Sequence, residues 1–164
     1  MPTIRGRVWK FGDNINTDLM FPGIAFTKPE AEQPKYVFWA NRPGWSDEVQ
    51  PGDVIIGGQN YGTGSSRPAA KQLKALGVAA VVADTVNGLF LRNCVNFGLP
   101  ALSVPGVAEL FEEGETAEID FENATITNVE KGQTLSGKQL PDELVKLTQA
   151  GGILPLLKAE GFLK

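Results

Sequence analysis

Apolar runs separated by helix-like segments mark the middle of the chain. Residues 54–57, 78–83 and 99–104 are mostly apolar and are bounded by turn formers, a pattern typical of buried strands. Between them, residues 69–76 and 86–95 have the length and composition of short helices. A strand–helix–strand passage pairs its strands in parallel, so the sequence predicts an α/β fold with a parallel βαβ core.

Further strands and a helix are expected outside this core. Residues 3–9 suit a strand. Residues 116–121 and 125–129 alternate apolar with polar on either side of a turn at 122–123, which predicts a hairpin. Residues 141–150 open with Pro-Asp and are followed by two glycines, which are start and stop signals of a helix.

The region between residues 13 and 50 has no regular period. We expect a polar turn over 13–18, a loop over 21–30 and irregular structure over 31–50. Trp39 and Trp45 lie in the last of these segments. Large aromatic side chains dominate cores more often than they form docking faces, so we expect both tryptophans to be buried.

Composition limits the class of protein. The chain has 164 residues, 42% of them hydrophobic, which suits a single domain over residues 1–164. Its formal net charge is −4, so no general electrostatic attraction to nucleic acid or to an anionic membrane is expected. The first residues carry no apolar signal segment, and no later run is long enough to span a membrane. We expect a cytoplasmic protein with no nucleic-acid or membrane partner.

The cysteine and histidine counts exclude several kinds of site. Cys94 is the only cysteine and there is no histidine, so the chain cannot form an internal disulfide, an iron–sulfur cluster site or a structural zinc site by itself. A Ser–His–Asp triad is excluded for the same reason. Cys94 lies in an apolar stretch, and we expect it to be a small core residue rather than a reactive thiol.

A polar loop follows the apolar run at 54–57. Residues 58–67 read Gly-Gln-Asn-Tyr-Gly-Thr-Gly-Ser-Ser-Arg, and Pro68 suits the first position of the helix that follows. Backbone N–H groups at such a helix start favour an anion, and the Arg67 guanidinium fits a carboxylate or a phosphate. The loop has no P-loop lysine, and Arg67 stands where a dinucleotide fingerprint needs its third glycine. The loop is therefore expected to bind another oxyanionic ligand.

The two serines of this loop allow two interpretations. If clustered N–H donors and Arg67 lower the pKa of the Ser65 hydroxyl, Ser65 can act chemically as an alkoxide. Alternatively, Ser65 and Ser66 only cap the following helix.

Three further segments accompany the loop. Residues 6–18 end in Asn-Thr-Asp, residues 90–100 include Leu-Arg-Asn-Cys, and residues 150–158 begin Ala-Gly-Gly-Ile-Leu-Pro. Together with residues 58–67, in this order and over nearly the whole chain, they resemble the small subunits of 3-isopropylmalate dehydratase, a family of the aconitase superfamily. The resemblance implies the β/β/α fold of the aconitase swivel domain.

The resemblance also implies an activity. It indicates the small subunit of a two-subunit hydro-lyase that removes water from a small-molecule hydroxy diacid, 3-isopropylmalate first, and adds it back. It places a [4Fe–4S] cluster on a separate large subunit, where the cluster acts as a Lewis acid. Two alternatives stay open: a relative that acts on a maleate/malate or dimethylmalate pair, and a non-catalytic anion-binding subunit that regulates a partner.

Carried over residue by residue, the resemblance makes Ser65 the catalytic base. It makes Arg67 a clamp for a substrate carboxylate, with Ser66 donating to the same group. Asp18 would line the site, although an aspartate in a turn can also serve only that turn. The residues assigned to substrate binding are Asp18, Ile24, Ala25, Phe26, Asn60, Gly64, Ser66 and Arg67. Arg92, Asn93 and Asn96 would support the loop from behind.

The chain departs from the family pattern at two places. Pro68-Ala69 stands where the family usually has Glu-His, and residues 23–27 form a shorter segment than the Arg-Tyr-Leu type that distinguishes substrates. Ile24, Ala25 and Phe26 carry no charge, so a second or longer carboxylate chain would be desolvated without a cation. We therefore expect a hydrogen, methyl or isopropyl substituent on the substrate.

Overall fold

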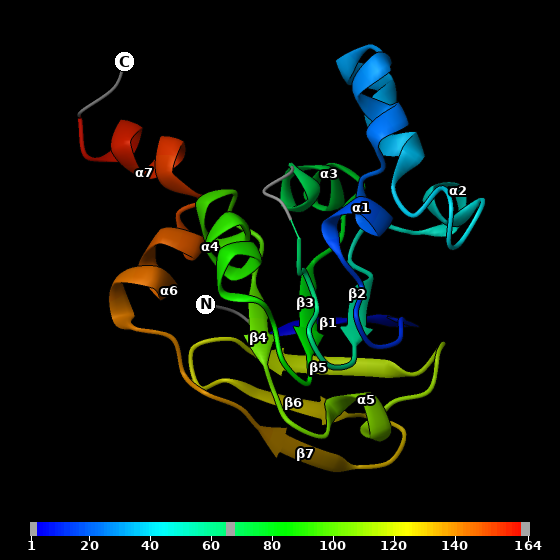
Figure 1. Ribbon diagram of the computed structural model, residues 1–164. Coiled ribbons are helices and arrows are strands. Elements are labelled where there is room, and N and C mark those ends of the chain that lie inside the picture. The colour runs from blue at the N-terminus through cyan, green and yellow to red at the C-terminus, as the bar shows by residue number, and fades with distance from the viewer. Residues whose placement is uncertain (1–2, 65–67, 162–164) are drawn as a thin grey trace.

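The computed structural model describes residues 3–64 and 68–161. Their strands form one mixed sheet in the order β4-β3-β2-β1-β5-β6-β7 (Figure 1). The strands are Ile4–Lys10 (β1), Val54–Gly57 (β2), Ala80–Ala83 (β3), Ala101–Ser103 (β4), Thr116–Asp120 (β5), Thr125–Asn128 (β6) and Gln133–Ser136 (β7).

The parallel half of the sheet contains β1 to β4. Val8 pairs with Val54, Val54 with Ala80, and Val82 with Leu102, all in parallel register. Helices α3 (Ala69–Ala75) and α4 (Gly88–Asn96) make the crossovers from β2 to β3 and from β3 to β4. Every residue of β2 and β3 is buried, as strands covered on both faces must be. The predicted parallel βαβ core is confirmed.

The antiparallel half contains β5, β6 and β7. Ile119 faces Ile126 across the predicted hairpin, and β5 joins the parallel half by pairing antiparallel with β1. Strand β7 was not predicted, because three of its four residues are exposed and its sequence shows no apolar alternation. This strand forms because the tight turn that ends at Gly132 pairs it with β6, and not because its side chains are buried.

Two apolar cores lie on opposite faces of the sheet. Because successive side chains of a strand point to opposite faces, Ile55 joins the core beneath α3 and α4, whereas Val54 and Ile56 join the other. The second core is closed by β5, β6 and the short helix α5 (Val107–Leu110). Figure 1 shows α1, α3, α4 and α7 above the antiparallel strands and α5 beside those strands.

The segment expected to be irregular forms an arm of short helices. It contains η1 (Gly23–Thr27), η2 (Glu30–Tyr36) and α2 (Trp45–Glu48). Trp45 is fully buried and packs edge-on against Phe38, with ring centroids 5.0 Å apart, as expected for a core residue. The same expectation was wrong for Trp39, which is 49% exposed.

Two helices end the described chain. The predicted helix α6 (Asp142–Gln149) is followed by α7 (Ile153–Ala159), which was not predicted. Pro155 stands in the first turn of α7, where proline is tolerated because the N–H has no intrahelical partner. Gly152 lies so close to α4 that a Cβ there would be 2.1 Å from the Asn96 carbonyl oxygen. Only glycine permits this approach, which sets α7 beside the end of α4.

Candidate active site

Two loops from the parallel half run side by side. Residues 11–16 leave β1 and residues 58–64 leave β2, and both turn back over the first core. Backbone hydrogen bonds of 2.7–2.8 Å join them: Phe11 N–H to Ile56 C=O, Asn14 N–H to Gln59 C=O, Gly62 N–H to Ile15 C=O and Thr17 N–H to Thr63 C=O. This pairing brings two motifs together that lie more than forty residues apart in the sequence.

Gly64 lies against the start of α1 (Thr17–Met20). Its φ of +106° suits glycine, and a Cβ there would be 3.1 Å from the Thr17 Oγ1 atom. Asn16 caps this helix, because its side-chain oxygen accepts from the Leu19 N–H at 2.9 Å. The expected polar turn therefore ends in a helical turn that sets the exposed Asp18 one residue beyond the contact with Gly64.

The loop after β2 follows α4 along its length. The Tyr61 carbonyl accepts from the Asn87 N–H at 2.8 Å, just before α4 begins. At Gly62, a Cβ would be 2.4 Å from the Phe90 Cβ, so loop and helix touch there. Pro68 then borders a hollow together with Asn96 at the far end of α4. The loop thus starts at the carboxyl end of β2. Pro68, at the other end of the loop, lies beside the far end of α4, a nine-residue helix about 13 Å long.

Asn60 lies at the start of the loop, far from Pro68. Its N–H donates to the Thr85 hydroxyl at 2.7 Å, and its side-chain nitrogen donates to the Asn14 side-chain oxygen at 3.2 Å. Asn60 has a φ of +57°, a conformation that asparagine tolerates better than most residues. These contacts favour a role in shaping the loop over direct contact with a ligand near Gly64.

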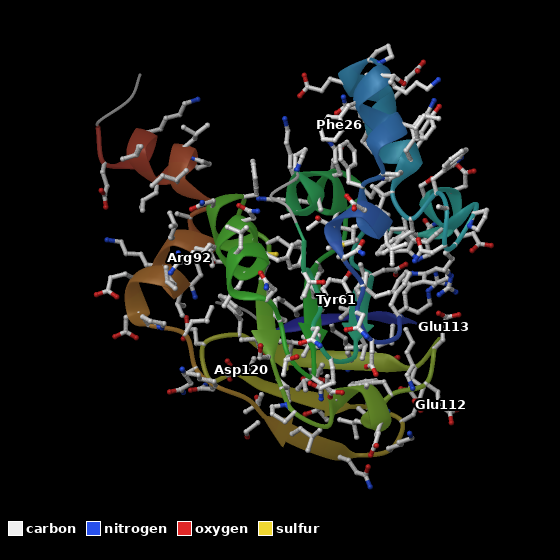
Figure 2. The ribbon with its side chains drawn as sticks, viewed as in Figure 1. Phe26, Tyr61, Arg92, Glu112, Glu113 and Asp120 are labelled. Carbon is white, nitrogen blue, oxygen red and sulfur yellow. The ribbon has the colours of Figure 1, made fainter. Side chains whose placement is uncertain are left out.

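Tyr61 anchors the loop in the first core, a role that the sequence reasoning missed. Its side chain is fully buried, and its ring centroid is 5.6 Å from that of Phe90 (Figure 2). Burial raises the pKa of the Tyr61 phenol and also that of the Cys94 thiol. Cys94 is therefore a protonated core residue, as expected, and not a reactive thiolate. A lone aromatic residue in an otherwise polar loop was the available signal for this anchor.

The proposed specificity segment lies in η1. Ala25 is fully buried, whereas Ile24 is 39% and Phe26 53% exposed. Figure 2 shows Phe26 on the side of the arm that faces α3. The arm is tied to α3 by an ion pair of 2.9 Å between Lys71 and Glu30. Of the three predicted residues, Ile24 and Phe26 can present side-chain surface to a ligand, and Ala25 supports them from inside.

Ser65, Ser66 and Arg67 lie outside the described residues. Helix α3 begins at Ala69, one residue later than expected, and Pro68 precedes it with no capping side-chain oxygen. Ala69 is buried, so a histidine of the usual family pattern would not fit there without displacing core atoms.

The loop-supporting residues on α4 divide into two groups. Asn93 and Asn96 border the hollow next to Pro68. Figure 2 shows Arg92 directed toward α6 instead, away from the loop, so the expectation that it supports the loop was wrong.

The donor groups of this chain do not fit a metal cluster. No group of three His, Cys, Asp or Glu residues is placed to hold a metal ion within residues 3–64 and 68–161. The single cysteine is buried and protonated, and the chain has no histidine. In the same described part of the chain, no helix is long and apolar enough to cross a membrane.

Comparisons with known proteins agree with the fold and with the family resemblance. The family model of the aconitase C-terminal domain matches residues 13–106, which include most of the first paired loop, all of the second, α3 and α4. The chain is 40% identical over 158 residues to the isopropylmalate/citramalate isomerase small subunit of Methanocaldococcus jannaschii, covering 94% of each. It is 41% identical over 160 residues to 3-isopropylmalate dehydratase small subunit 1 of Methanopyrus kandleri, covering 96% of this chain and 94% of the relative.

A solved structure shares the fold. The crystal structure of 3-isopropylmalate dehydratase from Methanocaldococcus jannaschii matches with a TM-score of 0.90 at 29% identity, over 98% of this chain and 96% of that one. The α/β fold class and the family resemblance predicted from the sequence are confirmed.

Proposed function

The chain belongs to the aconitase C-terminal domain family, and we propose that it is the small subunit of a two-subunit hydro-lyase that acts on 3-isopropylmalate. One observation carries the proposal furthest. Gly64, the residue before Ser65-Ser66-Arg67, packs against Asn16 and Thr17 at the start of α1, next to Asp18 in the sequence. The family resemblance assigns both segments to the active site. They are far apart in the sequence, but they contact each other in the fold.

We place the iron–sulfur cluster on the large subunit. The family membership supports such a cluster in the complete enzyme, and the donor groups of this chain do not fit one. The chain's own part is to remove a proton from carbon and to hold a carboxylate. A partner with an oxygen-sensitive cluster favours the cytoplasm, where the environment is reducing.

Ser65 is the proposed base. As an alkoxide it accepts the carbon-bound proton of the substrate, and backbone N–H groups around Gly64 together with Arg67 lower the hydroxyl pKa enough to form it. Arg67 grips a substrate carboxylate through two parallel hydrogen bonds, and Ser66 donates to the same carboxylate. Asp18 lines the site from the first turn of α1.

The side chains of the arm determine which substrate the enzyme prefers. Ile24 and Phe26 expose apolar surface, which suits the alkyl group of a substituted malate and gives a second carboxylate no cation. One similar protein is named for both isopropylmalate and citramalate, which differ in the size of an apolar group. Apolar pockets discriminate by only about 1–3 kcal/mol per methylene, so we propose overlapping activity on alkylmalates and little on citrate.

A serine substitution in the complete two-subunit enzyme tests this proposal. If Ser65 is the base, Ser65→Ala lowers kcat by about 10²- to 10⁴-fold while the urea midpoint of the chain stays within error. If Ser65 only caps α3, the same variant loses about 1 kcal/mol of stability and keeps its turnover. Ser46→Ala is the matched control, because it removes a serine hydroxyl on the arm, which donates to the Lys35 carbonyl at 2.9 Å.

A further inference from the structure

A hollow of about 630 Å³ lies between α4, α7 and the start of α3. Its wall contains two asparagines and otherwise apolar or backbone surface, from Pro68, Asn93, Asn96, Phe97, Gly151, Ile153, Leu154 and Pro155. Three of its apolar side chains are well exposed: Leu154 by 62%, Ile153 by 39% and Phe97 by 37%. Exposed apolar side chains gathered around one hollow mark a binding surface more often than scattered ones do.

Close contacts join the walls of the hollow. At Gly98, a Cβ would be 2.4 Å from the carbonyl carbon of Gly151, so the loop after α4 and the loop before α7 touch backbone to backbone. The Lys74 ammonium on α3 donates a hydrogen bond to the Phe97 carbonyl at 2.8 Å. Helix α7 itself buries none of its residues. The hollow is thus preformed, and one of its walls is a helix that this chain leaves uncovered within its described residues.

The described wall of the hollow suits an apolar group better than the proposed substrate. None of the described residues that line it is charged. A hydroxy diacid carries two carboxylates, and burying them there would cost several kcal/mol per charge without a cationic partner. An apolar side chain loses no polar contact with water on entering the hollow, and it fits the surface of Phe97, Ile153 and Leu154.

The position of the hollow points to the occupant. Pro68 lines it and is one peptide bond from Arg67 of the proposed active-site loop. In the proposed function, the large subunit must cover that loop, because it brings the cluster to the substrate. A surface centred on that loop would continue into the hollow on one side and toward Phe26 of the arm on the other.

We propose that this hollow anchors the large subunit by receiving an apolar side chain from it, with Leu154 as the central contact. The inference rests on the proposed function. A stable interface covers about 800 Å² on each partner, and a few central apolar contacts supply most of its free energy. The hollow would be such a centre, while the arm and the loop complete the interface.

Leu154→Asp tests the anchor, and Leu89→Asp is its matched control. Both replace an exposed leucine with a carboxylate, but Leu89, 46% exposed, lies at the start of α4, about 10 Å from the α4 end that borders the hollow. Titration of the purified large subunit should give a Kd about 30-fold higher for Leu154→Asp and within about 3-fold of wild type for Leu89→Asp. Because Leu154 is outside the catalytic machinery, an excess of large subunit should restore wild-type kcat on 3-isopropylmalate.

A second variant guards against a folding defect in the first. Asn96→Trp places a ring in the hollow at an exposed position, and it should raise the same Kd while the urea midpoint stays near that of wild type. An unchanged Kd for both Leu154→Asp and Asn96→Trp, with wild type binding and turning over normally, overturns the anchor and leaves the proposed function intact. A wild-type chain that forms no complex at all overturns both. Self-association of the isolated chain that Leu154→Asp abolishes would assign the hollow to a second copy instead.

Discussion

The parallel and antiparallel halves of the sheet differ in how their strands are connected. In the antiparallel half, β5, β6 and β7 are joined by turns of a few residues that stay at the sheet edge. In the parallel half, the chain leaves β1 and β2 in long loops that fold back over the core and pair with each other. Every residue assigned to the proposed site belongs to those two connections or to the arm between them.

This difference in connections indicates which part of the fold can hold an active site. A hairpin turn satisfies its own hydrogen bonds and needs no distant partner. The paired loops depend on each other and on α4 through close contacts such as Gly62 against Phe90. Such dependence fixes backbone N–H groups and side chains in place, which is what a site that stabilises an alkoxide requires.

Two glycine substitutions compare the halves most sharply. Gly62 and Gly114 both have φ near +90°, but a Cβ at Gly62 would meet Phe90 at 2.4 Å, whereas a Cβ at Gly114 would meet nothing within 4 Å. Gly114→Ala should cost about 1 kcal/mol from backbone strain alone. Gly62→Ala should cost about 3 kcal/mol, since overpacking adds to that strain. Urea unfolding measures the free energy lost in each variant. Equal losses would show that the loop moves to accommodate the added Cβ and is not held tightly against α4.

Arg67→Lys should have the next largest effect. An ammonium cannot form two parallel hydrogen bonds to a carboxylate, so KM for 3-isopropylmalate in the complete enzyme should rise about 10-fold, with a smaller change in kcat. Lys71→Arg is the control, since Lys71 is a cation on α3 whose described partner is Glu30 on the arm. Unchanged kinetics in Arg67→Lys would remove Arg67 from the substrate site.

The smallest effect concerns the ion pair that joins the arm to the antiparallel half. The Arg42 guanidinium donates to both carboxylate oxygens of Glu113, at 2.7 and 2.6 Å. This hydrogen bonding lowers the pKa of Glu113 below its ordinary value. A carboxylate with a lowered folded-state pKa stabilises the fold above its unfolded pKa of about 4.3, and loses that stabilisation as pH falls through the folded value.

Glu113→Gln should therefore cost about 0.5 kcal/mol at pH 7, an amount reduced by solvent screening of this partly exposed pair, and close to nothing well below pH 4. Glu118→Gln is the control, because its contact with Arg5 is longer, at 3.4 Å, and more exposed. A Glu113→Gln penalty that grows as the pH falls would contradict the assignment.

The sequence predicted the elements whose pattern is local. Apolar runs identified β2 and β3, and alternation around a turn identified the hairpin of β5 and β6. It did not predict β7, which pairing with β6 forms, or the short helices of the arm, where Pro29 and Pro34 prevent a longer one. Helix α7 was missed because close glycine contacts with α4 place it.

The site could also be predicted only in part, because its motifs are local in sequence but its burial and contacts are not. The motif and the family resemblance named Gly64 and Asp18, and the structure brings their segments together. Burial could not be read residue by residue, so Ala25 was expected to line a pocket although it lies inside the arm. Asn60 shares the motif with Gly64, but the loop between them runs beside α4 and carries the two apart.

Reconstitution with the large subunit tests the central claim most directly. The purified chain and the purified large subunit are assayed separately and together, without oxygen and with iron supplied, for conversion of 3-isopropylmalate. The account predicts no turnover and no bound iron for this chain alone, and turnover with both subunits that saturates at a fixed ratio of the two. Turnover by this chain alone, or by the large subunit at an undiminished rate without it, would contradict the account.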